Sequence, residues 1–192
     1  MQHTEQVSNN GLQWFPMRVR YSSGARLMAL RDALTAQDVE CHVPLVFKKV
    51  GDRMQFAPAI NNLIFLHATR ETVSSLKQTA DFSCLSYMMR RELDADGAEL
   101  TEVLTVPRQQ MDDFIRVTTE RSEDIVYLDN LDFACRPSAM VQITEGPFAG
   151  VVGRLKSLRK HLCVVLPIDG VAAVAITHIP RKHLIYLDTD KQ

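Results

Sequence analysis

The sequence predicts an α+β protein in two parts, an N-terminal α/β sandwich and a small five-stranded C-terminal β-barrel. Two observations lead to this prediction. Up to residue 118, short strand-like apolar runs alternate with helical spacings of three and four. From residue 138, short apolar runs follow one another with no helix between them. Apolar residues form 46% of the 192 residues and charged residues 23%, which is typical of a globular protein.

The N-terminal part predicts the element order β-α-β-β-α-β-β-α. The expected strands, recognised by β-branched and aromatic residues between turn signals, are 14–21, 39–50, 63–66, 85–93 and 100–106. The run Leu63–Leu66 is apolar throughout, as in a strand buried on both faces. Each expected helix follows a suitable start signal, and these signals are Ser22-Ser23-Gly24, Thr69 and Pro107.

Apolar stripes give each helix one buried face. The residues of these stripes, in chain order, are Leu27, Leu30 and Leu34, then Val73 and Leu76, then Met111, Phe114 and Ile115. These elements define a predicted first domain of residues 12–118. Residues 119–137 are acidic, end at Pro137 and predict a linker that packs locally through Ile125, Tyr127 and Leu128.

The C-terminal part, residues 138–188, is predicted as a barrel domain. Its expected strands are 140–144, 151–158, 162–166, 172–177 and 184–187. Five short strands in about fifty residues bury one core best by curling into a barrel.

Charge and cysteine usage narrow the class of protein. Residues 138–192 hold seven Lys and Arg against four Asp and Glu, a net of +3, whereas residues 1–137 have a net of −4. This split permits RNA or an acidic partner at the C-terminal end without requiring either. The four cysteines form no C-x-x-C pair, which indicates reduced thiols. With a polar start and no long apolar run, the sequence predicts a cytoplasmic protein.

The most informative motif runs from Val141 to Gly153. Val141 and Ile143 are expected to face the barrel core. Gly146 and Pro147 predict a tight reversal, because proline fixes φ and glycine accepts conformations that other residues avoid. Phe148 is expected to cover the open end of the barrel, and Gly150 and Gly153 to let the next strand bend or approach another backbone closely.

This motif resembles the KOW motif in the form found in NusG-type transcription factors, which is an SH3-like barrel. Three further segments agree with the resemblance: Trp14-Phe15 before Ser23-Gly24, the sequence of Phe65–Thr69, and Val106-Pro107 with residues 109–117. The segment of Val106-Pro107 with residues 109–117 is similar to the UpxY-like paralogues, which antiterminate capsular polysaccharide operons. The resemblance covers residues 12–188 and implies an NGN-like first domain. One departure is Asn61-Asn62-Leu63, where the family has Pro-Gly-Tyr.

The resemblance implies a non-enzymatic transcription elongation and antitermination factor without cofactors. Its first domain would bind the clamp helices of the largest RNA polymerase subunit, and its KOW domain would recruit a ribosomal protein, a termination factor or nascent RNA. The implied polymerase-binding residues are Trp14, Phe15, Phe56, Ile60 and Leu63. Exposed aromatic residues are good interface anchors. The alternative interpretation, that these are core residues, stays open, above all for Phe15 and Phe56.

Polar and basic residues supply two further candidate contacts. The first set, implied to lie near polymerase or upstream DNA, is Arg18, Arg20, Ser22, Ser23 and Arg26. The second is a basic patch after the KOW turn, made of Arg154, Lys156, Arg159 and Lys160. For both sets, the alternative is an ordinary solvated face or helix cap.

The sequence holds no convincing catalytic or metal-binding motif. Cys41-His42 and His161-x-Cys163 supply zinc-ligand types but lack structural-zinc spacing. Asp94-x-Asp96-Gly97 is too short for a calcium loop and predicts a hairpin turn. A thiol enzyme using Cys84 has no nearby histidine in sequence. We expect no metal and no enzymatic activity. The main alternative function is an RNA-binding or ribosome-associated KOW module that does not act on polymerase.

Overall fold

The computed structural model describes residues 11–20, 23–93, 99–120, 122–128, 136–158, 160–168 and 170–187. The chain forms two compact units, the first of Met1–His42 and Asn62–Pro107, the second of Val43–Asn61 and Arg108–Gln192. The backbone therefore passes from one unit to the other three times. The mixture of helices and strands confirms the predicted α+β class. No helix in the described ranges is long and apolar enough to cross a membrane.

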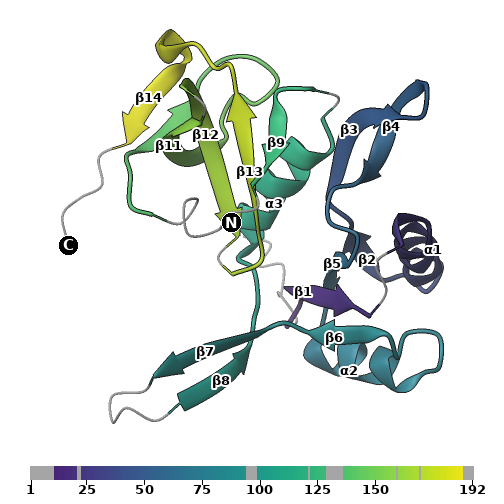
Figure 1. Ribbon diagram of the computed structural model, residues 1–192. Coiled ribbons are helices and arrows are strands. Elements are labelled where there is room, and N and C mark those ends of the chain that lie inside the picture. The colour runs from purple at the N-terminus through teal and green to yellow at the C-terminus, as the bar shows by residue number, and fades with distance from the viewer. Residues whose placement is uncertain are drawn as a thin grey trace, which may run out of the picture. The chain divides into compact units, whose positions relative to one another are not determined.

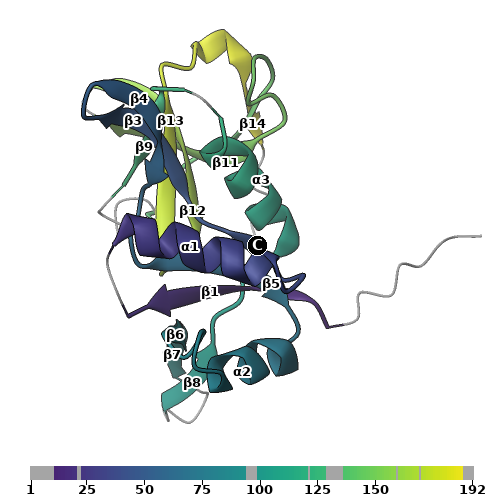
Figure 2. The ribbon, with the colours of Figure 1, turned by 90° about the vertical axis from the view of Figure 1, so that its right-hand side faces the viewer.

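The first unit is built on an antiparallel four-stranded sheet with the order β2-β5-β1-β6. Its elements are β1 (Gln13–Val19), α1 (Gly24–Thr35), β2 (Glu40–His42), β5 (Leu63–Ala68), α2 (Arg70–Gln78), β6 (Leu85–Tyr87), β7 (Met89–Leu93) and β8 (Glu99–Val103). In Figure 2, β1 lies between α1 on one side and α2 on the other. Strands β7 and β8 form a separate two-stranded ribbon.

The centre of this sheet is buried on both faces. In β1, the residues from Trp14 to Met17 are all buried, and in β5 so are the residues from Leu63 to Leu66. Helix α1 buries Leu27, Leu30 and Leu34, as its spacing predicts. Helix α2 begins at Thr69, whose side-chain oxygen accepts a hydrogen bond from the Thr72 N–H at 3.1 Å.

The second unit contains a six-stranded antiparallel sheet with the order β14-β10-β11-β12-β13-β9. Its elements are β3 (Leu45–Val50), β4 (Arg53–Pro58), α3 (Arg108–Thr118), β9 (Ile125–Tyr127), β10 (Met140–Ile143), β11 (Val152–Leu158), β12 (His161–Ile168), β13 (Ala172–Thr177), the 3-10 turn η1 (Arg181–His183) and β14 (Leu184–Leu187). Strands β3 and β4 pair only with each other among the described strands (Figure 1).

Strand β13 is buried along its whole length. All six of its residues are buried, which requires cover on both faces. Helix α3 contacts β13, and the Gln110 side-chain amide donates to the Pro167 carbonyl at 2.5 Å. Burial of Met111, Phe114 and Val117 completes the apolar stripe of α3. Helix α3 therefore belongs to the same unit as the C-terminal strands.

Several local features differ from the sequence expectation, and one is that the strand predicted over 85–93 divides into β6 and β7. The strand predicted over 39–50 divides at Val43-Pro44 into β2 and β3, because proline cannot donate to a ladder. Strand β4 was not predicted, since Arg53–Pro58 has a weak apolar pattern. Residues 125–127 of the predicted linker form β9, which pairs with β13. The predicted boundaries at 118 and 138 thus do not coincide with the edges of the two units.

Candidate interaction surfaces

Three of the five predicted polymerase-binding residues lie in the core of the first unit. Trp14 is 3% exposed, Phe15 1% and Leu63 0%. The Trp14 indole stacks on the His67 imidazole, with ring centroids 4.8 Å apart. The prediction that Trp14 and Leu63 are exposed anchors is therefore wrong, and the alternative core interpretation holds for Phe15. The reason is that β1 and β5 are inner strands whose two faces are both covered.

The other two predicted residues, Phe56 and Ile60, belong to the second unit and are half-buried. Phe56 lies opposite Phe47 in the β3–β4 hairpin, and the two rings make an edge contact at 5.3 Å. Lys49 and Met54 also lie opposite each other, two positions further along the hairpin. Because successive side chains of a strand point to opposite faces, these two lie on the same hairpin face as the two phenylalanines. Both are exposed, Met54 by 43%. This basic and apolar face was not predicted.

The predicted nucleic-acid contacts lie near the start of the first unit. Arg18 is exposed and donates to the Asn62 side-chain oxygen at 3.0 Å. Arg20 is exposed and donates to the Ser83 carbonyl. Ser23 is the N-cap residue of α1 but makes no side-chain capping bond. Ser22 lies outside the described residues. The two arginines are thus solvent-accessible, and each side chain donates a hydrogen bond to a residue distant in sequence.

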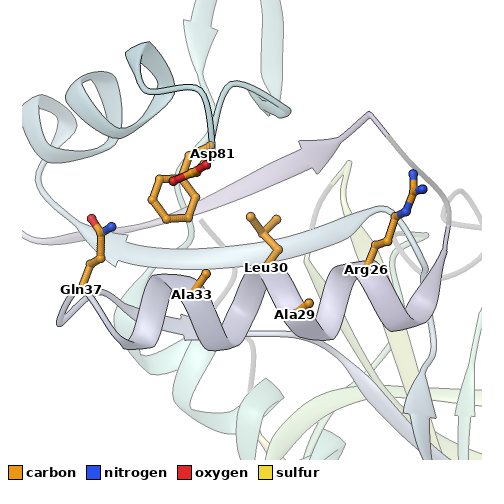
Figure 3. Close-up of a pocket in the computed structure, with 7 residues that line it drawn as sticks. Arg26, Ala29, Leu30, Ala33, Gln37 and Asp81 are labelled. Carbon is orange, nitrogen blue, oxygen red and sulfur yellow. The ribbon is translucent and has the colours of Figure 1, made fainter.

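A shallow pocket of about 390 Å³ lies between α1 and the Asp81-Phe82 turn. Arg26 lines one end of it and Gln37 the other (Figure 3). The floor between them is formed by small and apolar side chains of α1, namely Ala29, Leu30 and Ala33. The titratable side chains that line it are Arg26 and Asp81.

The KOW-like turn takes the backbone conformations that its residue types require. Gly146 and Gly150 have positive φ values of 85° and 91°. The Gly150 N–H donates to the Ile143 carbonyl at 2.6 Å, and the Ile143 N–H donates to the Val151 carbonyl at 3.0 Å, which closes the turn. Phe148 is buried.

Gly153 marks a close approach between two strands. A Cβ atom there would lie 2.7 Å from the Val164 Cγ1 and 2.8 Å from the Val165 carbonyl oxygen, shorter than real contacts allow. The turn also meets helix α3, because Arg116 Nη2 donates to the Pro147 carbonyl at 3.0 Å. The motif therefore permits the close approach of β11 to β12 and contacts α3 through Arg116.

The predicted basic patch is only partly available to a ligand. Lys156 is 9% exposed, and its ammonium donates to the Arg136 carbonyl at 2.5 Å. Arg154 is half-buried and donates to the same carbonyl at 3.4 Å. Lys160 is exposed, whereas Arg159 lies outside the described residues. The prediction that Lys156 presents its charge to a partner is wrong, because its amine is directed at the backbone.

Hydrogen bonds between Asp124 and Thr177 join the start of β9 to the end of β13. The Asp124 carbonyl accepts from the Thr177 N–H at 2.8 Å and from the Thr177 hydroxyl at 2.9 Å. The Asp124 carboxylate lies 2.9 Å from His178 Nδ1, and the His161 ring centroid lies 5.2 Å from that of His178. Within the described residues, no group of three or more His, Cys, Asp or Glu side chains is arranged to hold a metal ion.

Burial is the main cause of the pKa shifts of one histidine, one tyrosine and two cysteines. It lowers the pKa of His42 to about 4 and raises the pKa of Tyr127, whose hydroxyl donates to the Leu45 carbonyl at 3.1 Å. It also raises the pKa of the Cys41 and Cys163 thiols, against the opposing effect of local hydrogen bonds. A raised thiol pKa disfavours the nucleophilic thiolate.

The last strand of the sheet was predicted as a strand but not as a surface. In β14, Ile185 is 54% exposed, Tyr186 60% and Leu187 36%. The sequence signal for this surface is the apolar run Leu184–Leu187, which forms the end strand of the six-stranded sheet and not a strand of a closed barrel.

Neither a protein-family model nor a curated protein matches the sequence. Among solved structures, the chain is similar to one described as "Domain interaction in Thermotoga maritima NusG". The TM-score is 0.45 and the sequence identity 14%, over 92% of this chain and 98% of that chain. A similarity of this degree establishes neither family nor function.

Proposed function

We propose that the chain is a non-enzymatic transcription elongation and antitermination factor of the NusG type, which binds RNA polymerase and recruits a partner through its C-terminal sheet. The observation that carries the proposal is the turn of residues 143–153. Its sequence resembles the KOW motif, and its glycines take the positive φ values and the close strand approach that the motif's composition implies. The UpxY-like role in antitermination of capsular operons is the finer form of the same proposal.

The proposed polymerase contact is the hairpin face of Phe47, Lys49, Met54 and Phe56, with the half-buried Ile60 following it in sequence. Exposed apolar and basic groups on one face suit an acidic, partly apolar protein surface, such as the clamp helices that the family resemblance implies. This surface keeps Phe56 and Ile60 from the predicted one and omits Trp14, Phe15 and Leu63, which are buried.

The mechanism that we propose is differential binding, with no bond made or broken. A factor that binds the elongating polymerase more tightly than the paused one shifts the equilibrium between them. A preference of about 1.4 kcal/mol changes that equilibrium roughly tenfold.

A pull-down with core RNA polymerase tests the contact surface. Met54→Asp places a carboxylate on the hairpin face, and Met89→Asp is a matched control on the β7–β8 ribbon, where Met89 is 50% exposed. We expect Met54→Asp to weaken polymerase binding at least about fivefold, whereas Met89→Asp leaves it unchanged. Equal binding by both variants would reject this surface, and no binding by the wild type would reject the function.

Transcription in vitro through a terminator tests the activity itself. The proposal expects greater readthrough with the wild-type protein, and less readthrough with Met54→Asp than with Met89→Asp. Readthrough restricted to particular leader sequences would support the specialised role. Pausing and termination unchanged by saturating wild-type protein would contradict the proposal.

An RNA-binding module that does not act on polymerase is the second candidate, favoured by the net charge of +3 in residues 138–192 and by the exposed Lys160. It predicts that the full chain binds single-stranded RNA with an affinity that falls steeply with salt concentration. Lys160→Glu should then weaken RNA binding and leave polymerase binding unaffected.

A further inference from the structure

Among the described strands, β14 is an edge strand of the six-stranded sheet. It pairs with β10 on one side, and no described strand pairs with the other. The Thr144 N–H donates to the His183 carbonyl at 2.9 Å, next to the register pair Ile143 and Leu184. In an antiparallel pair, hydrogen-bonded and non-hydrogen-bonded residue pairs alternate. Leu184 and Tyr186 therefore direct their backbone groups away from β10.

Hydrogen bonds of β10 on its other side support this assignment. The Ile143 N–H donates to the Val151 carbonyl at 3.0 Å, so Ile143 bonds toward β11 and not toward β14. The Leu184 N–H is used locally, by the Arg181 carbonyl. The Leu184 carbonyl and both backbone groups of Tyr186 remain directed to the edge, which is the arrangement that an added strand needs.

The side chains beside this edge are apolar and the charges near it are basic. Ile185 and Leu187 project on one face of the sheet and Tyr186 on the other, and all three are exposed. Arg181 and Lys182 lie directly before β14 and are exposed. The Glu145 carboxylate lies 3.1 Å from His183 Nε2. Asp188, which follows β14 in sequence, is included in the net charge of +3 for residues 138–192.

We infer that the free edge of β14 binds an extended, acidic peptide segment of a partner protein, in which acidic residues alternate with apolar ones. Backbone groups of Leu184 and Tyr186 would hydrogen-bond the added strand, its apolar side chains would pack on Ile185 and Leu187, and its carboxylates would lie near Arg181 and Lys182. In antiparallel self-pairing, the basic turn of each copy would lie at the C-terminal end of the other copy's β14, so a second copy is the alternative occupant that the dimer measurement below decides.

This inference extends the recruitment step of the proposed function, but its test needs no polymerase. The probe is the synthetic peptide acetyl-Glu-Val-Glu-Ile-Glu-Val-Glu-amide, and the matched control replaces each Glu by Lys. Binding to the full chain is measured by fluorescence anisotropy. We expect the acidic peptide to bind at least about tenfold more tightly than the basic one, and added salt to weaken its binding. Equal affinities would overturn the charge argument and with it the inference.

Two substitutions at one position separate the backbone from the side chain. Tyr186→Pro removes the edge N–H without removing a hydrogen bond to β10, whereas Tyr186→Ala keeps the N–H and loses the ring. Tyr186→Pro should lose peptide binding at least about tenfold, and Tyr186→Ala should stay within about threefold of wild type. Peptide binding by Tyr186→Pro at wild-type strength would overturn strand addition.

Amide hydrogen exchange on the wild-type chain gives a reading independent of variant folding. The acidic peptide should slow exchange of the Tyr186 N–H and leave that of the buried Val174 unchanged. Three results would overturn the inference: no slowing at Tyr186, protection by an RNA oligonucleotide instead of the peptide, or a dimer without peptide that Tyr186→Pro abolishes. If polymerase binds and the peptide does not, strand addition fails and the proposed function stands. If the peptide binds and polymerase does not, strand addition stands and the proposed function fails.

Discussion

The Trp14 indole lies parallel to the His67 imidazole, with ring centroids 4.8 Å apart and an angle of 16° between the ring planes. The two residues are directly opposite in the register of β1 and β5. On the next strand, Glu40 is opposite His67, and its carboxylate lies 2.6 Å from His67 Nδ1. A tryptophan that is expected to contact a partner is instead one end of a row of side chains across three strands, with His67 at its centre.

Trp14→Ala should destabilise the protein by about 3–5 kcal/mol, because it removes a buried aromatic side chain and leaves a cavity. Urea unfolding followed by circular dichroism measures this change. Leu100→Ala, at a position that is 47% exposed, is the control and should change stability by less than about 0.5 kcal/mol. A similar, small effect of both substitutions would place Trp14 outside the core.

The buried His42 makes stability depend on pH. Burial lowers its pKa in the folded state to about 4 from an ordinary value of 6.5. Between these values the unfolded chain binds more protons at this residue than the folded chain does, so stability falls as pH falls. Above pH 6.5 the buried His42 does not lower the free energy of unfolding. Toward pH 4 it lowers that free energy by up to about 3 kcal/mol.

The measurement is the free energy of unfolding at pH 7 and pH 4.5, for the wild type and for His42→Gln. All other ionisable groups are the same in both proteins, so the difference between them isolates His42. The variant should lose less stability on acidification than the wild type. Parallel pH profiles would show that His42 is not a buried neutral imidazole.

Gly153→Ala should cost about 1–3 kcal/mol, because the added methyl group would meet Val164 Cγ1 at 2.7 Å and the Val165 carbonyl oxygen at 2.8 Å. Backbone oxygen atoms cannot move away as a flexible side-chain end can. Thermal unfolding compares this variant with the wild type. Gly153→Ala with Val164→Ala should show favourable coupling between the two substitutions but incomplete rescue, since the carbonyl contact remains. Full rescue would show that Val164 alone closes this space.

The two helix caps of the first unit should respond differently to substitution. Thr69→Ala removes the bond to the Thr72 N–H and should cost about 1 kcal/mol. Ser23→Ala removes no side-chain capping bond at the start of α1 and should be nearly neutral. Denaturant unfolding of both variants tests the contrast. A Ser23→Ala cost equal to that of Thr69→Ala would mean that Ser23 caps α1 in solution.

Much of the fold could be predicted from local sequence signals. The three helices follow from their start signals and apolar stripes, and the five C-terminal strands lie close to their predicted positions. Strand β4 could not be predicted, because Arg53–Pro58 is stabilised by its pairing with β3 and lacks an apolar pattern of its own. Strand β9 has the right residue types, but only the long-range pairing with β13 makes it a strand.

The candidate site was harder to predict than the fold. The continuous apolar run Leu63–Leu66 indicates burial on both faces, and that rule is incompatible with Leu63 as an exposed anchor. The run Trp14–Met17 carries the same signal, with Pro16 inside it. Burial of Lys156 depends on the Arg136 carbonyl, twenty residues away, which no local pattern reveals. Sequence patterns thus locate strands better than they distinguish a covered face from an open one.

Because the chain passes between the two units three times, one cut in the backbone can leave elements of the same unit on two fragments. A protease that cleaves between Thr118 and Ser122 would leave β3, β4 and α3 on one fragment and β9 to β14 on the other. The bonds Tyr127 to Leu45, Gln110 to Pro167 and Arg116 to Pro147 all join these two fragments. The nicked protein should therefore stay together under native conditions and come apart only in denaturant.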